Sequence, residues 1–214
     1  MIKNIILDFD KDPEKVVDED LYSYSGRKNI EKVLSVEAIV NTTKLSLSAL
    51  GDFFINLQKL RLDNSTITTV RDIGCTFKNL RYLSLNNCGI TSLNGISTLS
   101  QNIEELYLQK NLIKDVSDLM GMEQLRILDL TDNQIADAAN LQFLSCCSNL
   151  KMLYFGGNPA IKNPNFQDDS QKFAPQLNII LKQRQEKKEN YQKIVSTQST
   201  NTNQNVNKKN ASEL

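Results

Sequence analysis

The side chains that could carry out chemistry in this chain are few, and histidine is missing altogether. The 214 residues include no histidine and four cysteines. Without an imidazole, the chain lacks the usual general base, the Ser-His and Cys-His nucleophile pairs and the commonest metal ligand. The sequence therefore predicts a protein that is not an enzyme and that holds neither a cofactor nor a metal.

The cysteines offer one pattern with a chemical meaning. Cys75 and Arg81 have the C-x5-R spacing of cysteine phosphatases, in which backbone amides of the loop cradle a phosphate. The intervening TFKNL contains no glycine and runs into a repeating leucine pattern, so we interpret the match as accidental. Cys88, Cys146 and Cys147 form no C-x-x-C pair of the kind that binds zinc. Structural roles are expected for these three.

The charge balance argues against polyanionic partners. Lysine and arginine total 25, as do aspartate and glutamate, so no field of one sign attracts nucleic acid or an anionic membrane. The N-terminus MIKNIILDFDKDPEK lacks the features of a signal sequence, and no stretch approaches the roughly 20 apolar residues of a membrane span. We expect a cytoplasmic-type compartment with reduced cysteines and no direct contact with nucleic acid or membrane.

Repeats supply the elements that would position a binding residue. The pattern L-x-x-L-x-L begins at Leu57, Leu80, Ile103, Leu125 and Leu150, at separations of 23, 23, 22 and 25 residues. Apolar residues then recur at every third position, which suits a short 3₁₀ or helical return. No such unit can bury its own leucines, so the units must stack. We expect an α/β solenoid of about five to six coils, with a parallel sheet on the concave face and helical or 3₁₀ returns on the convex face.

One polar position follows each strand pattern and forms a predicted structural ladder. It holds Ser65, Cys88, Asn111, Asn133 and Asn158. The chain bends inward there and leaves buried backbone groups that need a compact polar partner. Asparagine supplies both a donor and an acceptor, whereas serine and cysteine are weaker substitutes. We therefore expect the first two coils to be held less tightly than the last three.

The composition divides the chain into four predicted segments. They are an N-terminal segment and helical cap at 1–39, the solenoid at 40–166, a C-terminal cap with a charged helix at 167–195, and a disordered tail at 196–214. Residues 29–40 are expected to be the amphipathic capping segment, and residues 44–50 a first, degenerate strand. Pro175 fits the first turn of a helix in the C-terminal cap.

Strand residues that alternate with the leucines should point to the concave face. The first of the five repeats presents charge there, and the later ones present aromatic and apolar side chains with two acids. Such side chains are enriched at protein interfaces. The predicted partner-binding residues are Tyr82, Glu105, Tyr107, Ile127, Asp129, Met152 and Tyr154. Tyrosines at strand positions can also merely satisfy β propensity and stack across coils, and this alternative stays open.

The repeats also resemble a known class. The pattern N-x-I-x-x-[VAL]-x-x-L at 111–119 and 133–141 resembles the phosphatase-regulator-like class of leucine-rich repeats. The RDIG corner at 71–74, the N-C-G turn at 87–89 and the C-x-N-L-K-M-L at 147–153 resemble the leucine-rich-repeat-containing protein fifty-six family. This resemblance implies an adaptor without catalytic residues, in the cytoplasm and the cilium or axoneme, that serves assembly or transport of outer dynein arms.

The partners that the resemblance implies are proteins, namely dynein-arm or intraflagellar-transport components. We expect the chain itself to be a monomer. Two other functions stay open at this point. One is a regulatory subunit that grips the catalytic domain of a protein phosphatase, and the other is a scaffold that holds an RNA-binding-domain protein.

Overall fold

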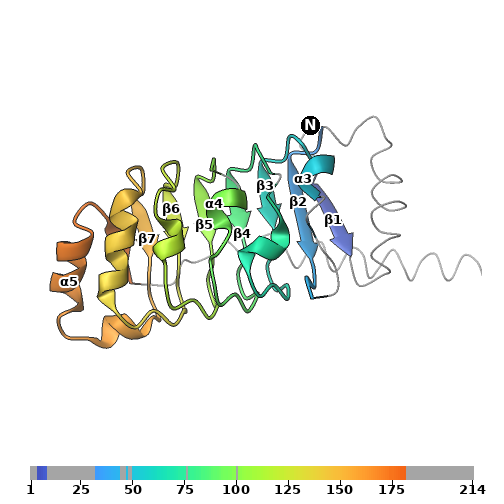
Figure 1. Ribbon diagram of the computed structural model, residues 1–214. Coiled ribbons are helices and arrows are strands. Elements are labelled where there is room, and N and C mark those ends of the chain that lie inside the picture. Colours follow the sequence, from blue (N-terminus) through green and yellow to red (C-terminus); the bar gives the residue numbers. More distant parts are fainter. Residues whose placement is uncertain are drawn as a thin grey trace, which may run out of the picture. The chain divides into compact units, whose positions relative to one another are not determined.

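The computed structural model describes residues 4–8, 32–43, 47, 50–75, 77–99 and 101–181. The strands form one parallel sheet in which chain order is also spatial order (Figure 1). They are β1 Asn4–Asp8, β2 Ser35–Ile39, β3 Lys59–Arg61, β4 Tyr82–Ser84, β5 Glu105–Tyr107, β6 Ile127–Asp129, β7 Met152–Tyr154 and β8 Asn178–Ile180. A parallel sheet in sequence order requires every strand to be followed by a return over the same side, as a solenoid provides.

The repeated leucines occupy equivalent places in neighbouring strands. Leu60, Leu83, Leu106, Leu128 and Leu153 are paired in register from β3 to β7, and none of their side chains is exposed. Since successive strand residues point to opposite faces, the residues on either side of each leucine turn away from the core. The predicted solenoid and its alignment of leucines are confirmed.

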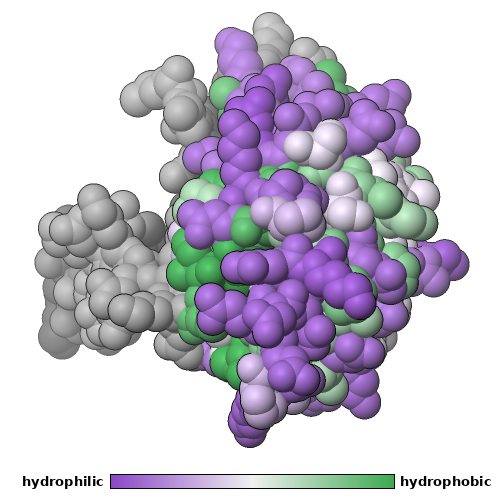
Figure 2. All heavy atoms as spheres, turned by 90° about the vertical axis from the view of Figure 1, so that its left-hand side faces the viewer, coloured by the Kyte–Doolittle hydropathy of each residue, from purple (hydrophilic) through white to green (hydrophobic). Residues whose placement is uncertain are grey.

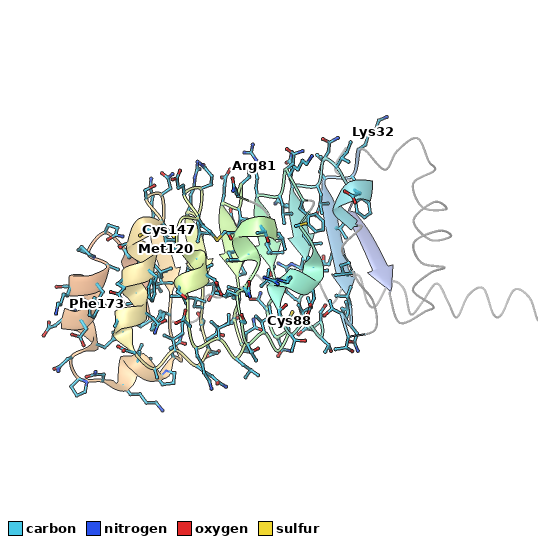
Figure 3. All side chains as sticks on the ribbon, viewed as in Figure 1. Lys32, Arg81, Cys88, Met120, Cys147 and Phe173 are labelled. Carbon is cyan, nitrogen blue, oxygen red and sulfur yellow. The ribbon has the colours of Figure 1, made fainter. Side chains whose placement is uncertain are left out.

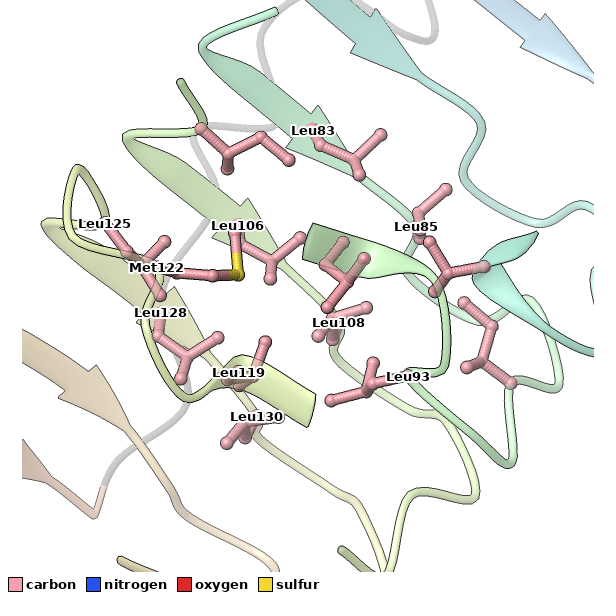
Figure 4. Packing of buried hydrophobic residues seen from close by; sticks show 14 of the residues in the cluster. Leu83, Leu85, Leu93, Leu106, Leu108, Leu119, Met122, Leu125, Leu128 and Leu130 are labelled. Carbon is pink, nitrogen blue, oxygen red and sulfur yellow. The ribbon is translucent and has the colours of Figure 1, made fainter. Parts of the chain in front are cut away.

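The returns pack on the other side of this core (Figure 1). They are α3 Leu50–Phe53, η3 Val70–Ile73, α4 Ile96–Leu99, η4 Ser117–Leu119, η5 Ala138–Cys146, η6 Pro159–Lys162 and α5 Phe166–Phe173, where η marks a 3₁₀ helix. Figure 4 shows Leu119 of a return facing Leu106 and Leu128 of the strands. Each buried leucine contributes roughly 1.5 to 3 kcal/mol, and this gain is made between coils rather than within one.

A left-handed residue turns the chain at the end of each repeat strand. Asn64, Asn87, Lys110, Asp132 and Gly157 have φ values of 61°, 56°, 57°, 57° and 77°. Each directly precedes a ladder residue. A β-carbon at Gly157 would collide with the Asp132 carboxylate of the preceding coil, so glycine leaves room for that carboxylate and adopts the positive φ without strain.

The N-terminal part of the sheet differs from the prediction. Ser35–Ile39 is the strand β2, which pairs in parallel with β3, so the predicted helical cap over 29–40 is wrong here. Val36, Ala38 and Val40 are buried, with a period of two that belongs to a strand. In the predicted strand 44–50, only Leu47 and the start of α3 fall within the described residues, and Leu47 lies outside any strand.

The C-terminal end also departs from the prediction. The helix α5 precedes Pro175 instead of starting at it, and the strand β8 follows. The alternating Leu177 and Ile179 pack partly against the core, as a final strand requires. The charged helix expected from residue 182 onward and the tail at 196–214 lie outside the described residues, as does most of the segment 1–31.

Candidate protein-binding surface

The described residues offer no constellation for metal or thiol chemistry. Within these ranges, no three histidine, cysteine, aspartate or glutamate side chains group as ligands for a metal ion. The Arg81 guanidinium of the C-x5-R match pairs with the Glu104 carboxylate at 3.1 Å. Cys75, the other end of that match, is exposed. No helix in the described part of the chain is long and apolar enough to cross a bilayer.

Two of the cysteines, Cys88 and Cys147, are buried (labelled in Figure 3). The Cys88 thiol donates to the Leu62 carbonyl over 3.0 Å, and the Cys147 thiol donates to the Leu119 carbonyl over 3.2 Å. Burial raises the pKa of Cys88 to about 12 and that of Cys147 to about 11. Both thiols therefore stay protonated near neutral pH and serve the core.

The asparagines of the ladder tie neighbouring coils together. Asn111 accepts from the backbone amides of Cys88 and Ile90 at 3.0 and 3.1 Å. It donates through Nδ2 to the carbonyls of Leu85 and Leu108 at 2.8 and 2.9 Å. The bonds with Cys88, Ile90 and Leu85 join Asn111 to the preceding coil, whereas Leu108 belongs to the same coil as Asn111.

The other ladder residues, which we call rungs, make the same set of hydrogen bonds or only some of them. Asn133 and Asn158 both accept from the preceding coil and donate to carbonyls of two coils. Ser65 accepts one bond, from the Val40 amide at 2.9 Å. Cys88 donates to the preceding coil but accepts nothing there among the described contacts. Serine and cysteine lack the second function of an amide, as their chemistry requires.

A second asparagine ladder, which the sequence analysis missed, runs along the corner that leads into the strands. Asn79, Asn102 and Asn149 donate through Nδ2 to backbone carbonyls of the preceding coil at 2.9, 2.7 and 2.8 Å. These asparagines are exposed and directly precede the first apolar residue of a repeat. The recurring Asn-Leu or Asn-Ile pair was the signal that could have revealed them.

Two rows of side chains cover the concave face, the sheet face that turns away from the returns. The first row, at the start of the strands, is Lys59, Tyr82, Glu105, Ile127, Met152 and Asn178. The second row, at their end, is Arg61, Ser84, Tyr107, Asp129, Tyr154 and Ile180. Members of the first row are half-buried or exposed, whereas three consecutive members of the second row are buried.

At the N-terminal end of this face, the charges are neutralised by one another. Arg61 lies 3.3 Å from the Asp63 carboxylate and donates to the Tyr82 hydroxyl at 3.1 Å. Asp63 also accepts from the Ser84 hydroxyl at 2.6 Å and from the Asn86 amide at 2.8 Å. This closed network leaves little unsatisfied polar capacity for a partner.

Two of the predicted contact residues are buried, which corrects the predicted site. Tyr107 and Asp129 are each 3% exposed. The centroids of the Tyr107 and Tyr82 rings lie 5.1 Å apart. The Tyr107 hydroxyl donates to the Glu105 carboxylate at 2.6 Å. Asp129 accepts from the Thr131 amide at 2.9 Å and holds the turn after β6. Strand alternation gives the face on which a residue lies but not its depth, so these two side chains support the face.

The remaining predicted residues form one accessible group, which we call the partner face: Tyr82, Glu105, Ile127, Met152 and Tyr154. Each is half-buried. Four of them are consecutive members of the first row, and Tyr154 lies two residues beyond Met152 on β7. The stacked strands thus present aromatic, aliphatic and thioether groups side by side with one carboxylate.

Comparison with known proteins agrees with this fold. A model of the leucine rich repeat matches residues 78–135. The Leucine-rich repeat-containing protein 56 of Mus musculus is 34% identical over 164 residues, which cover 71% of this chain and 30% of that protein. The protein of the same name from Homo sapiens matches with the same identity and coverage. The chain thus spans about 30% of the length of these relatives.

A solved structure shows the same architecture. The internalin C2 of Listeria monocytogenes superposes with a TM-score of 0.51 at 23% identity, over 62% of this chain and 56% of that one. This likeness concerns the fold alone. The repeat region of this chain therefore belongs to the leucine-rich-repeat family and is homologous to that of Leucine-rich repeat-containing protein 56.

Proposed function

We propose that this chain is an adaptor that holds a protein partner during assembly or transport of ciliary outer dynein arms. The leucine-rich-repeat fold supports the general role in protein–protein interaction. The observation that carries a binding role in this molecule is the partner face, where apolar side chains stay partly accessible on a sheet whose leucines are fully buried.

The partner face has the chemistry of an interface centre. Ile127 lies between Glu105 and Met152 in the first row. Aromatic residues and methionine are enriched at interfaces, because they bury a large area at small conformational cost. The Glu105 carboxylate, held by the Tyr107 hydroxyl, would match a lysine or arginine beside an apolar group on the partner.

The homology supports the ciliary part of the proposal. The relatives named Leucine-rich repeat-containing protein 56 match over the repeats that build the partner face. The family resemblance found in the sequence implies a factor for outer dynein arms. We accordingly propose dynein-arm or intraflagellar-transport components as partners and the cytoplasm and cilium or axoneme as the location.

Affinity capture from ciliated cells tests both parts of the proposal. The bait is the full chain, compared with the double variant Ile127→Lys and Met152→Lys, in which charge replaces the centre of the partner face. The matched control is Leu112→Lys with Met120→Lys, because these exposed apolar residues lie outside both rows. Quantitative mass spectrometry should recover dynein or intraflagellar-transport subunits with wild type and control, and at least about tenfold less with the double variant.

Other outcomes would replace the proposal. Recovery of a phosphatase catalytic subunit, or of an RNA-binding-domain protein, would favour one of the two other functions. Equal recovery of dynein subunits by all three baits would place the binding site outside the partner face.

A further inference from the structure

The sheet ends at β8 with an edge that no other described strand covers. The backbone amide of Asn178 donates to the Lys151 carbonyl at 3.2 Å, and the backbone amide of Phe155 donates to the Ile180 carbonyl at 2.9 Å. Both bonds join β8 to β7. Because backbone groups alternate in direction along a strand, the N–H and C=O of Ile179, between these residues, turn away from β7, toward the edge that no described strand covers.

A groove of mixed polar and apolar lining runs along the same edge. It has a volume of about 550 Å³ and lies between α5 and β8. On the side of α5 its lining combines Phe166 and Ala174 with the polar Gln167, Ser170 and Gln171. On the side of β8 it has the alternate residues Leu177, Ile179 and Leu181. Leu181 is 49% exposed. Figure 2 looks at this end of the solenoid and shows hydrophobic residues gathered along one side of it.

We propose that this edge pairs with the same edge of a second copy of the chain, in antiparallel orientation around a two-fold axis at Ile179. In that arrangement the N–H and C=O of Ile179 bond reciprocally with those of Ile179 of the second copy. The Leu181 amide meets the Leu177 carbonyl of the second copy. The Leu177 amide needs no new partner, because it already donates to the Ala174 carbonyl at 3.1 Å.

The chemistry of the groove favours an identical occupant. None of the described residues that line it is charged, so this part of the surface brings no like charges together between two copies. Leu177, Ile179 and Leu181 alternate on one side of β8, so in both copies they turn to the groove and merge the two cores. The stretch 177–181 also lacks the lysine and proline with which exposed edge strands discourage pairing. A two-fold contact of this kind closes on itself and adds no further copies.

This inference does not depend on the proposed function, and it departs from the monomer expected from the sequence. The sequence predicted a helix that starts at Pro175, whereas the structure has the strand β8 at Asn178–Ile180.

The first test is the mass of the full chain in solution as a function of concentration. Sedimentation equilibrium should show a shift from 24.2 kDa to twice that mass as concentration rises. Leu181→Lys should raise the dissociation constant at least about tenfold, because it places a charge in the merged groove. Leu112→Lys is the matched control, since Leu112 is 44% exposed on a different coil, and it should leave the mass distribution unchanged.

The second test is a disulfide across the axis. In a hydrogen-bonded antiparallel pair the Cα atoms lie about 5.5 Å apart, which is within the range for a disulfide. Ile179→Cys, in a chain with Cys75→Ser and Cys146→Ser, should form a covalent dimer on mild oxidation, and Leu112→Cys in the same chain should not. A chain that stays at 24.2 kDa and does not cross-link through position 179 would overturn the proposal.

Discussion

The first two rungs of the ladder, Ser65 and Cys88, contrast with the last three, Asn111, Asn133 and Asn158. Each asparagine accepts from one coil and donates to carbonyls of two coils, whereas serine and cysteine each perform one of these functions toward the preceding coil. The N-terminal end of the concave face also differs from its later strands. Its N-terminal end is closed by the Arg61–Asp63 network, and its later strands carry the partner face. Four of the five partner-face residues therefore lie in the most firmly tied coils, whereas Tyr82 lies in the coil of Cys88 and joins the Arg61 network.

The largest effect is expected at Asn133. Asn133→Ala removes the acceptor of the Ile113 amide and the donor to the Leu108 and Leu130 carbonyls, all of them buried. Leaving such groups unpaired costs roughly 1 to 3 kcal/mol, and we expect the upper part of this range. Urea unfolding followed by circular dichroism measures the change. A free energy of unfolding equal to that of wild type would remove the basis of the contrast.

Converting a weak rung into a strong one should act in the opposite direction. Cys88→Asn replaces a thiol that only donates with an amide that can also accept from the coil before it. We expect a gain of about 1 kcal/mol, the usual net value of one added hydrogen bond. The same unfolding experiment reports it, with Cys147→Asn as a control, because Cys147 lies outside the ladder and should lose stability. If Cys88→Asn also lowers the free energy of unfolding, the core at this position has no room for the larger amide side chain.

A smaller effect is expected at Ser65. Ser65→Ala deletes a single acceptor, that of the Val40 amide. The expected loss is about 1 kcal/mol or less, below that of Asn133→Ala in the same assay. Equal losses at the two positions would show that the number of bonds does not determine how firmly a rung holds.

The thiols give a further prediction, which concerns their reactivity and ionisation. Cys75 and Cys146 are exposed and should react with a maleimide in the native protein, whereas Cys88 and Cys147 should react only after unfolding. The thiol of Cys88 ionises near 9 when unfolded, and burial raises its pKa to about 12 in the fold. Its contribution to stability is therefore present below pH 9 and lost between about pH 9 and 12. Cys88→Asn should remove that part of the alkaline decline, and an identical decline in both proteins would contradict the assignment.

The repeat could be predicted from the sequence because its signal is redundant. Five starts at nearly constant spacing, a leucine pattern and a ladder position all indicate the same coil, so one substitution such as Cys88 does not hide it. Individual positions carried less information. In β2 and directly after it, the alternation of Val36, Ala38 and Val40 was overlooked because the segment shares none of the repeat's leucines. β8 was missed because Pro175 suggested a helix start.

The depth of a side chain was less predictable than its face. Strand alternation placed Tyr107 and Asp129 on the concave side but could not show that both are buried. Their burial depends on what surrounds them in three dimensions, such as the Tyr82 ring and the turn at Thr131. The second ladder was overlooked for a different reason, because its asparagines are exposed and resemble ordinary surface residues.

The measurement that tests the central contrast most directly is native-state hydrogen exchange resolved by segment. The amides of residues 105–135 lie in coils tied by asparagine, and those of residues 59–75 lie in coils tied by serine and cysteine. Hydrogen-bonded amides exchange through local opening, whose free energy reflects how firmly a coil is held. We predict slower exchange in 105–135 than in 59–75, and a reduced difference in Cys88→Asn. Equal protection, or slower exchange in 59–75, would contradict the account.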